Sequence, residues 1–245
     1  MKEFQFHDIY SLVSLIDRSV HYEEQFWNHD EEMFVAASAK FSRDTLLHLY
    51  TVTRAYNHYH RDFRKNGDLI EEDELEHWMS LFASYGVKIV PLKIEDEEEA
   101  EKWMDDNQDS FLDLFDKMSE EVFHILFPNR NFLIKFNRLV AEQIQETKYP
   151  TNVLTKKGTI KRVSIPKWVQ NAVFHRDKGR CIYCNTDLTG IVNTLTTKNF
   201  DHIVPLDMHG ANDPCNIQLA CEKCNKSKSN TEASTTNKYH PWWPE

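Results

Sequence analysis

The segment FDHIVPL, residues 200–206, decides the fold of the C-terminal third of this 245-residue chain. Apolar residues flank an Asp-His pair, a pattern that predicts a short strand delivering Asp201 and His202 side by side on opposite faces. A turn-rich loop, HGANDP at residues 209–214, comes next. It is followed by NIQL at 216–219 and by CEKCNKSK at 221–228. We expect the chemistry of the protein to lie in this block.

All five cysteines lie in the same third of the chain. Four of them form two C-x-x-C pairs, Cys181 with Cys184 and Cys221 with Cys224. Two such pairs supply four thiolates in a tetrahedron, which is the closed geometry of a structural Zn²⁺ site. The fifth, Cys215, we interpret as a small buried residue rather than a ligand. A zinc site of this kind stabilises a small module and does not by itself indicate a function.

The block from Arg176 to Lys228 resembles the HNH, or ββα-metal, endonucleases. The resemblance implies that a hairpin and a helix hold one divalent ion over a scissile phosphate. His202 matches the general base of the family, and Asp201 matches a carboxylate ligand of the catalytic ion. Asn216 matches the middle letter, a loop amide that positions the His-bearing strand, and Asn225 matches the last letter, which supplies the second ligand. The last letter is Asn here, a variant that the family accepts.

Two oxygen ligands suit Mg²⁺ or Mn²⁺ as the catalytic ion rather than zinc. The sequence therefore predicts a metal-dependent endonuclease that hydrolyses phosphodiester bonds of DNA. Basic residues near the motif are the predicted phosphate contacts: Arg176, Lys178, Arg180, Lys226 and Lys228.

Three other functions fit parts of the sequence. A zinc-ribbon module that binds nucleic acid or protein without cutting needs the four cysteines, but not Asp201, His202 and Asn225 in this order. A nucleobase deaminase is disfavoured because its Pro-Cys-x-x-Cys element is missing, since Arg180 and Ala220 precede the two pairs, and because four cysteines leave no ligand position for water. In the N-terminal half, Arg54, His58 and His60 faintly resemble the Arg and His element of HEPN-type ribonucleases.

Charge is distributed unequally along the chain. Residues 1–147 hold 15 Lys and Arg against 31 Asp and Glu, whereas residues 148–245 hold 14 against 8. A phosphate backbone attracts the second segment and repels the first. Only the C-terminal part is suited to contact DNA.

The N-terminal part is predicted to be mostly helical. Apolar residues recur at three- and four-residue steps over residues 8–145, with a break at Pro128 and Asn129 and a strand-like interruption at 87–92. We expect an α+β fold, in which a helical domain precedes a small zinc-stapled ββα-metal nuclease domain. Its predicted parts are an acidic helical domain (1–147), a basic linker with a hairpin around Gly158 (148–165), the nuclease domain (166–232) and an aromatic tail (233–245).

The remaining predictions concern partners and location. Composition and the absence of a long apolar run predict a cytoplasmic protein without a membrane span. An acidic helical domain fused to a nuclease suggests a regulated effector of antiviral defence or restriction. We expect residues 1–147 to bind a protein partner or to self-associate. The acidic run at 95–101 favours a solvated helix face or loop. The alternatives are a docking surface for a basic partner and a segment that occupies the basic groove of the nuclease until it is displaced.

Overall fold

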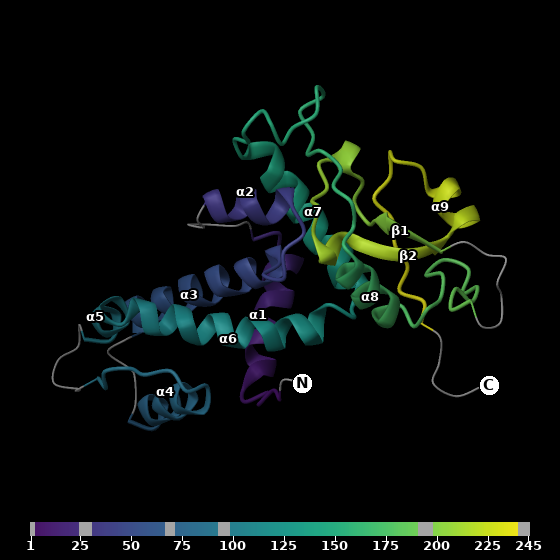
Figure 1. The fold of residues 1–245 in the computed structure, drawn as a ribbon. Coiled ribbons are helices and arrows are strands. Elements are labelled where there is room, and N and C mark those ends of the chain that lie inside the picture. The colour runs from purple at the N-terminus through teal and green to yellow at the C-terminus, as the bar shows by residue number, and fades with distance from the viewer. Residues whose placement is uncertain (1–2, 25–30, 67–71, 93–98, 191–197, 240–245) are drawn as a thin grey trace. The chain divides into compact units, whose positions relative to one another are not determined.

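A computed structural model describes residues 3–24, 31–66, 72–92, 99–190 and 198–239 (Figure 1). By its internal contacts the chain divides into two compact units. The first holds the described residues up to 19 together with those of 47–124, and the second holds 20–24, 31–46 and the chain from 125 onward. The domain bounds that we derive from composition stay a prediction.

The first unit is helical and has an aromatic core. Trp78, Phe82, Trp103 and Phe111 contact one another with ring centroids 5.0 to 6.5 Å apart, mostly edge to face, the geometry that aromatic pairs prefer. The helices of this unit are α1 (Ile9–His21), α3 (Leu46–Asn66), α4 (Glu72–Ser84), α5 (Glu99–Asp106) and α6 (Gln108–Leu126), of which α1, α3 and α6 each extend by one or two residues into the second unit.

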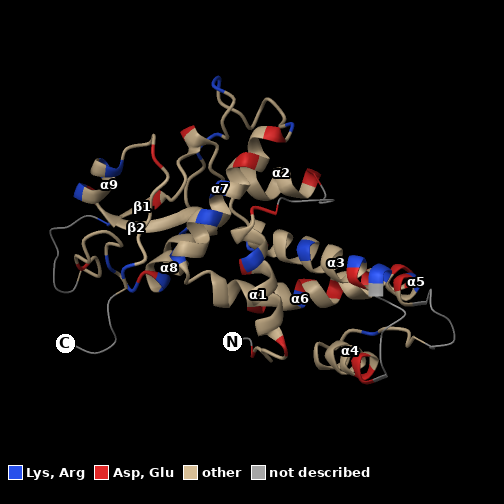
Figure 2. Ribbon diagram, turned by 180° about the vertical axis from the view of Figure 1, so that it is seen from behind, with Lys and Arg blue, Asp and Glu red and all other residues tan. Residues whose placement is uncertain are grey.

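Helices α3 and α6 lie side by side in the first unit (Figures 1 and 2). His48 stacks on Phe123 at 4.8 Å, and Tyr59 stacks on Phe115 at 5.6 Å between ring centroids. Leu47, Tyr50 and Ala55 of α3 are fully buried, whereas Tyr59 on the same apolar stripe is half-buried. The mostly helical character predicted for the N-terminal part is confirmed.

The second unit surrounds helix α7 (Arg130–Glu146). The predicted break before it is present, because α6 ends at Leu126 and Asn129 caps α7 by accepting a hydrogen bond from the Phe132 N–H at 3.1 Å. Nine residues of α7 are buried, so this helix forms part of the core. The other helices of the unit are α2 (Glu31–Ala39), α8 (Lys167–Arg176) and α9 (Glu222–Lys228), with 3-10 turns at Leu206–Met208 and Pro214–Asn216.

A two-stranded antiparallel sheet forms the centre of the C-terminal region. Strand β1 (Lys198–His202) pairs with β2 (Ile217–Cys221), and α9 follows β2 directly. In this register Asp201 lies opposite Gln218 and His202 lies opposite Ile217. All of β2 is buried. The predicted fold, a small strand pair with a helix after a mostly helical region, is confirmed.

The strand predicted at 87–92 is wrong. The structure assigns no strand to these residues. The Val87 N–H donates to the Phe82 carbonyl, and backbone groups of Lys88 and Val90 bond to side chains. Asn107 accepts from the Val90 N–H at 3.1 Å, and the Trp103 indole donates to the Val90 carbonyl at 2.6 Å. This apolar, β-branched run thus bonds to side chains of α5, α6 and the turn between them rather than to a second strand.

For three further predictions the structure gives only a partial answer. The hairpin around Gly158 is present as a single bridge between Leu154 and Ile160. Residues 95–98 of the acidic run and residues 240–245 of the tail lie outside the described residues. Within the described ranges, no helix is both long and apolar enough to cross a membrane.

Candidate functional site

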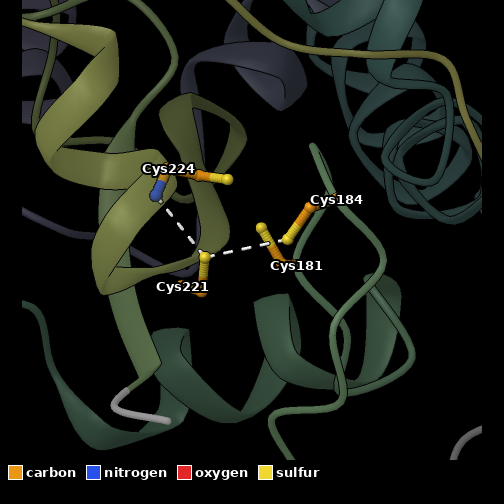
Figure 3. Close-up of side chains that lie close together, drawn as sticks. All are labelled: Cys181, Cys184, Cys221 and Cys224. Carbon is orange, nitrogen blue, oxygen red and sulfur yellow. Dashed lines mark hydrogen bonds between the residues drawn. The ribbon is translucent and has the colours of Figure 1, made fainter.

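The four cysteines of the C-x-x-C pairs meet in one cluster (Figure 3). Their sulfur atoms all lie within 4.8 Å of one another, and the Sγ atoms of Cys184 and Cys221 are 3.8 Å apart. Two of the ligands come from the loop after α8 and two from the junction of β2 and α9. Residues 40 positions apart in the sequence are therefore held at one point.

Local backbone geometry explains why each pair presents its thiols together. The turn at Cys181 is closed by the Asn185 N–H, which donates to the Cys181 carbonyl at 2.8 Å, with Asn185 in a left-handed conformation. Cys221 is the N-cap of α9, and its sulfur accepts from the Cys224 N–H at 3.5 Å. Both pairs are thus set by tight turns of a few residues.

The cluster fits a structural zinc ion. A tetrahedral site with Zn–S bonds of about 2.3 Å separates its sulfurs by about 3.8 Å, which is the separation of Cys184 and Cys221. Burial opposes ionisation of Cys184, but hydrogen bonds from Thr186 and the neighbouring cysteines outweigh it and lower its pKa to about 6. The donor set and its spacing suggest structural zinc.

Asp201 lies at the end of β1 and is held by two side chains. The Lys228 ammonium donates to Oδ2 of Asp201 at 2.8 Å, and the Gln218 amide donates to the same oxygen at 3.1 Å. Lys228 also donates to the carbonyl of His202. Both contacts use Oδ2, and within the described ranges no contact of Oδ1 is recorded, so this oxygen is available to a cation.

Asn225 lies in α9, the helix that also carries Lys228. Residues three apart in a helix share a face, and Lys228, three positions after Asn225, reaches Asp201. Asn225 is half-buried. The spacing within the helix thus puts the neutral amide of Asn225 on the same helix face as the residue that contacts the Asp201 carboxylate.

His202 is buried, with 1% of its surface exposed. Within the described part of the chain, neither ring nitrogen has a hydrogen-bond partner. Burial, followed by the positive charge of Arg162, lowers the pKa of His202 to about 4, although the neighbouring Asp201 carboxylate opposes the shift. The imidazole is therefore neutral at neutral pH and can accept a proton.

Asn216 holds the loop that follows His202. Its amide oxygen accepts from the Val204 N–H at 2.8 Å, and its amide nitrogen donates to the carbonyls of Val204 and Ala211, each at 3.0 Å. Its own carbonyl accepts from the Ile203 N–H at 2.7 Å. This is the geometry expected of a residue that positions the His-bearing strand.

The predicted phosphate contacts differ in their surroundings. The prediction that Arg176 contacts phosphate is corrected. Its side chain is 1% exposed and donates to Asp177 through Nε and Nη2, both at 2.9 Å. The same prediction for Lys228 is corrected for the same reason, since its side chain is 2% exposed and bonded to Asp201. Lys226 is exposed beside Glu222. Lys178 and Arg180 are half-buried.

Sequence reasoning missed a buried ionic network beside the cysteine cluster. Asp177, whose side chain is 0% exposed, accepts from Arg130 at 3.2 Å, from Arg176 and from the Leu219 N–H at 2.9 Å. The Arg130 ring contact is with Tyr239, 3.9 Å from the guanidinium carbon to the ring centroid. No local pattern signals this network, because Arg130 and Asp177 are 47 residues apart.

Two other sequence predictions concern residues outside the site. Cys215 is fully buried and does not belong to the four-cysteine cluster, which agrees with its interpretation as a small buried residue. Arg54, His58 and His60 all lie on α3 in the first unit. Arg54 is buried, and the His60 ring is 2.9 Å from the Asp105 carboxylate.

A comparison with known families agrees with this geometry. The model of the HNH endonuclease family matches residues 181–231, the segment that contains the four cysteines, β1, β2 and α9. No curated protein and no solved structure matches the chain. The chain thus carries an HNH endonuclease domain at residues 181–231.

Proposed function

We propose that this protein is a metal-dependent HNH endonuclease that hydrolyses phosphodiester bonds of DNA. The observation that carries the proposal is that Asp201 and His202 lie at the end of β1, where Lys228 of α9 contacts both residues. The four-cysteine cluster fastens the start of α9, so it supports this arrangement without taking part in chemistry.

His202 is the proposed general base. A neutral imidazole can take a proton from the attacking water, and the buried ring is neutral at neutral pH. A pKa of about 4 is low for this task. An anionic phosphate bound near the ring would favour the imidazolium and raise this pKa toward the working pH.

Asp201 and Asn225 are the proposed ligands of Mg²⁺ or Mn²⁺. Carboxylate and amide oxygens are hard donors, which these ions prefer. A bound ion would supply stabilisation of the charge that develops on the phosphate and the leaving oxygen. Gln218 and Lys228 orient the Asp201 carboxylate through Oδ2. Asn216 acts through the backbone, by holding the loop after His202.

The proposed substrate is DNA, contacted by the basic C-terminal segment. Lys178, Arg180 and the exposed Lys226 are the phosphate contacts that we retain.

We further propose that the acidic helical region binds a protein partner or self-associates, and that the protein is a regulated effector of antiviral defence or restriction in the cytoplasm. Light scattering of the protein alone and with products of neighbouring genes tests this; a monomer that cuts DNA without a partner argues against it.

Plasmid cleavage with Mg²⁺ tests the proposed chemistry. We expect His202→Ala and Asn225→Ala to reduce the cleavage rate by about 100-fold or more, because one removes the base and the other a ligand of the ion. Both variants should keep the zinc content of the wild type, since neither residue is a thiol.

The matched control is His175→Ala, which removes an exposed histidine of α8 in the same unit. Its cleavage rate should equal that of the wild type. If His202→Ala and Asn225→Ala still cut at the wild-type rate, the catalytic assignment is wrong. If the wild type binds DNA but does not cut it under any divalent ion, a zinc-ribbon binding module is the better description.

A further inference from the structure

Asn212, in the loop between β1 and β2, is clamped by three hydrogen bonds. Its amide nitrogen donates to the Ala39 carbonyl at 3.0 Å and to the Lys161 carbonyl at 2.8 Å. Its backbone N–H donates to the Ser38 carbonyl at 2.9 Å. The side chain is fully buried. Both amide hydrogens are used, so the direction of the amide oxygen is determined.

That oxygen has no donor in the described part of the chain. Oδ1 of Asn212 is buried and unpaired, and so are both ring nitrogens of His202. A buried polar atom without a partner destabilises the fold, so two such groups in the same region call for an explanation.

The loop brings the two residues together. Asn216 bonds to Val204, two residues after His202, and to Ala211, one residue before Asn212. Burial lowers the pKa of His202, and the Asn212 side chain acts in the opposite direction, as an acceptor that lies near the ring does.

We propose that Asn212 is a positioning residue whose amide oxygen accepts a hydrogen bond from one ring nitrogen of His202 and thereby selects the tautomer of the base. A neutral imidazole has one N–H and one lone pair, and the partner of the N–H determines which nitrogen is left to accept a proton. The catalytic consequence rests on the proposed function; the hydrogen bond does not.

The division of labour between the two asparagines follows from their bonds. The Asn216 side chain makes three hydrogen bonds, all to backbone groups of Val204 and Ala211, so it holds the loop. The Asn212 amide nitrogen donates to the carbonyls of Ala39 and Lys161, and its amide oxygen is unpaired within the described residues. The carbonyls that clamp it come from α2 and from the basic segment, which lie far from the HNH motif in sequence.

Nuclear magnetic resonance of zinc-loaded, ¹⁵N-histidine-labelled protein tests the hydrogen bond directly. His202→Gln assigns the His202 signals by their loss. In the wild type at pH 7 we expect one neutral tautomer, with well-separated shifts for the two ring nitrogens. In Asn212→Ala the preference should be lost and the two shifts should approach each other. A wild-type ring without a preferred tautomer overturns the proposal, even if the alanine variant does not fold.

Asn137→Ala is the matched control. Asn137 is another buried asparagine of this unit, whose amide bridges the carbonyls of Leu133 and Cys215 at 2.8 and 2.9 Å. Its loss should destabilise the fold similarly and leave the His202 tautomer unchanged. If Asn137→Ala shifts the His202 signals as much as Asn212→Ala, the effect is structural and the proposal is wrong.

Cleavage kinetics give the catalytic readout. Asn212→Ala should lower kcat by about 10- to 100-fold with little change in KM, because a misoriented base slows proton transfer but not binding. An unchanged kcat together with a lost tautomer preference would overturn the catalytic part. A wild type that does not cut DNA would overturn the proposed function alone, since the spectra would still report the hydrogen bond.

Discussion

At the scale of single residues, Gly210 shows how closely the loop after β1 is packed. A Cβ atom at this position would lie 2.0 Å from the Val204 carbonyl oxygen and 2.9 Å from the Asn216 amide nitrogen. These two groups are hydrogen-bonded to each other, and this bond holds the segment after His202. Only glycine fits here, because the obstacle is backbone that cannot rotate away.

Gly210→Ala should therefore destabilise the protein by about 3 kcal/mol, the upper range for overpacking. Gly158→Ala is the control, since a Cβ there meets nothing within 4 Å and costs only the strain of a left-handed backbone, about 1–2 kcal/mol. Chemical denaturation measures both. Equal losses in the two variants would contradict the close packing at Gly210.

Asp213 is a second residue whose surroundings make a prediction. It is buried and accepts from the N–H groups of Leu46 and Cys215 at 2.9 and 2.7 Å. Burial raises its pKa to about 6, and the two N–H groups oppose this only in part. A folded-state pKa above the unfolded value means that the stability contributed by Asp213 is present at low pH and is lost as the pH rises toward 6.

The comparison with Asp213→Asn isolates this effect from that of His202, whose lowered pKa acts in the opposite direction. The wild type should be more stable than the variant by an amount that shrinks by about 1 kcal/mol between pH 5 and pH 7. Unfolding by denaturant at both pH values measures the difference. A difference that stays constant or grows with pH would show that the buried carboxyl is ionised throughout.

At the scale of elements, the cysteine cluster joins the loop after α8 to the start of α9. Helix α9 has only seven residues, too few to be stable alone, so its position depends on tertiary contacts and on the thiols. Lys228, which holds Asp201, lies in this helix. Loss of the metal should consequently disturb the proposed active site as well as the cluster.

We expect one zinc ion per chain by elemental analysis, and loss of zinc, stability and cleavage together in Cys184→Ser or after extraction by a strong chelator. Cys215→Ala is the control, because this cysteine lies outside the cluster and its loss should leave the zinc content unchanged. Full zinc content in Cys184→Ser would mean that the four thiols do not form one site.

At the scale of the molecule, the nuclease region does not stand apart from the helices before it. Within the second unit, Arg130 of α7 contacts Asp177 after α8 and the carbonyls of Thr236 and Lys238. One guanidinium thus joins a helix, the turn before the cysteine loop and the chain after α9. These contacts join α7 to the C-terminal region within one compact unit.

Arg130→Met should destabilise the protein by about 3 kcal/mol, because it removes one of the two cations paired with the buried Asp177 carboxylate and the donor of the Thr236 and Lys238 carbonyls. Arg138→Met on the same helix removes an exposed arginine and should cost less than about 0.5 kcal/mol. Thermal and chemical unfolding compare the two. Equal effects would mean that Arg130 is a surface residue in solution.

The sequence alone determined the features whose geometry is local. The C-x-x-C spacing predicted the four-thiol cluster, and the apolar periodicity predicted the helices, because a few neighbouring residues set each of these. The tertiary structure decided whether each polar residue is buried and what it bonds to. Arg176 and Lys228 were expected to face DNA, yet they are enclosed beside Asp177 and Asp201. The burial and bonding of these two side chains, like those of Asn212, depend on segments many residues away. Burial is a property of the packed unit that no short stretch of sequence encodes.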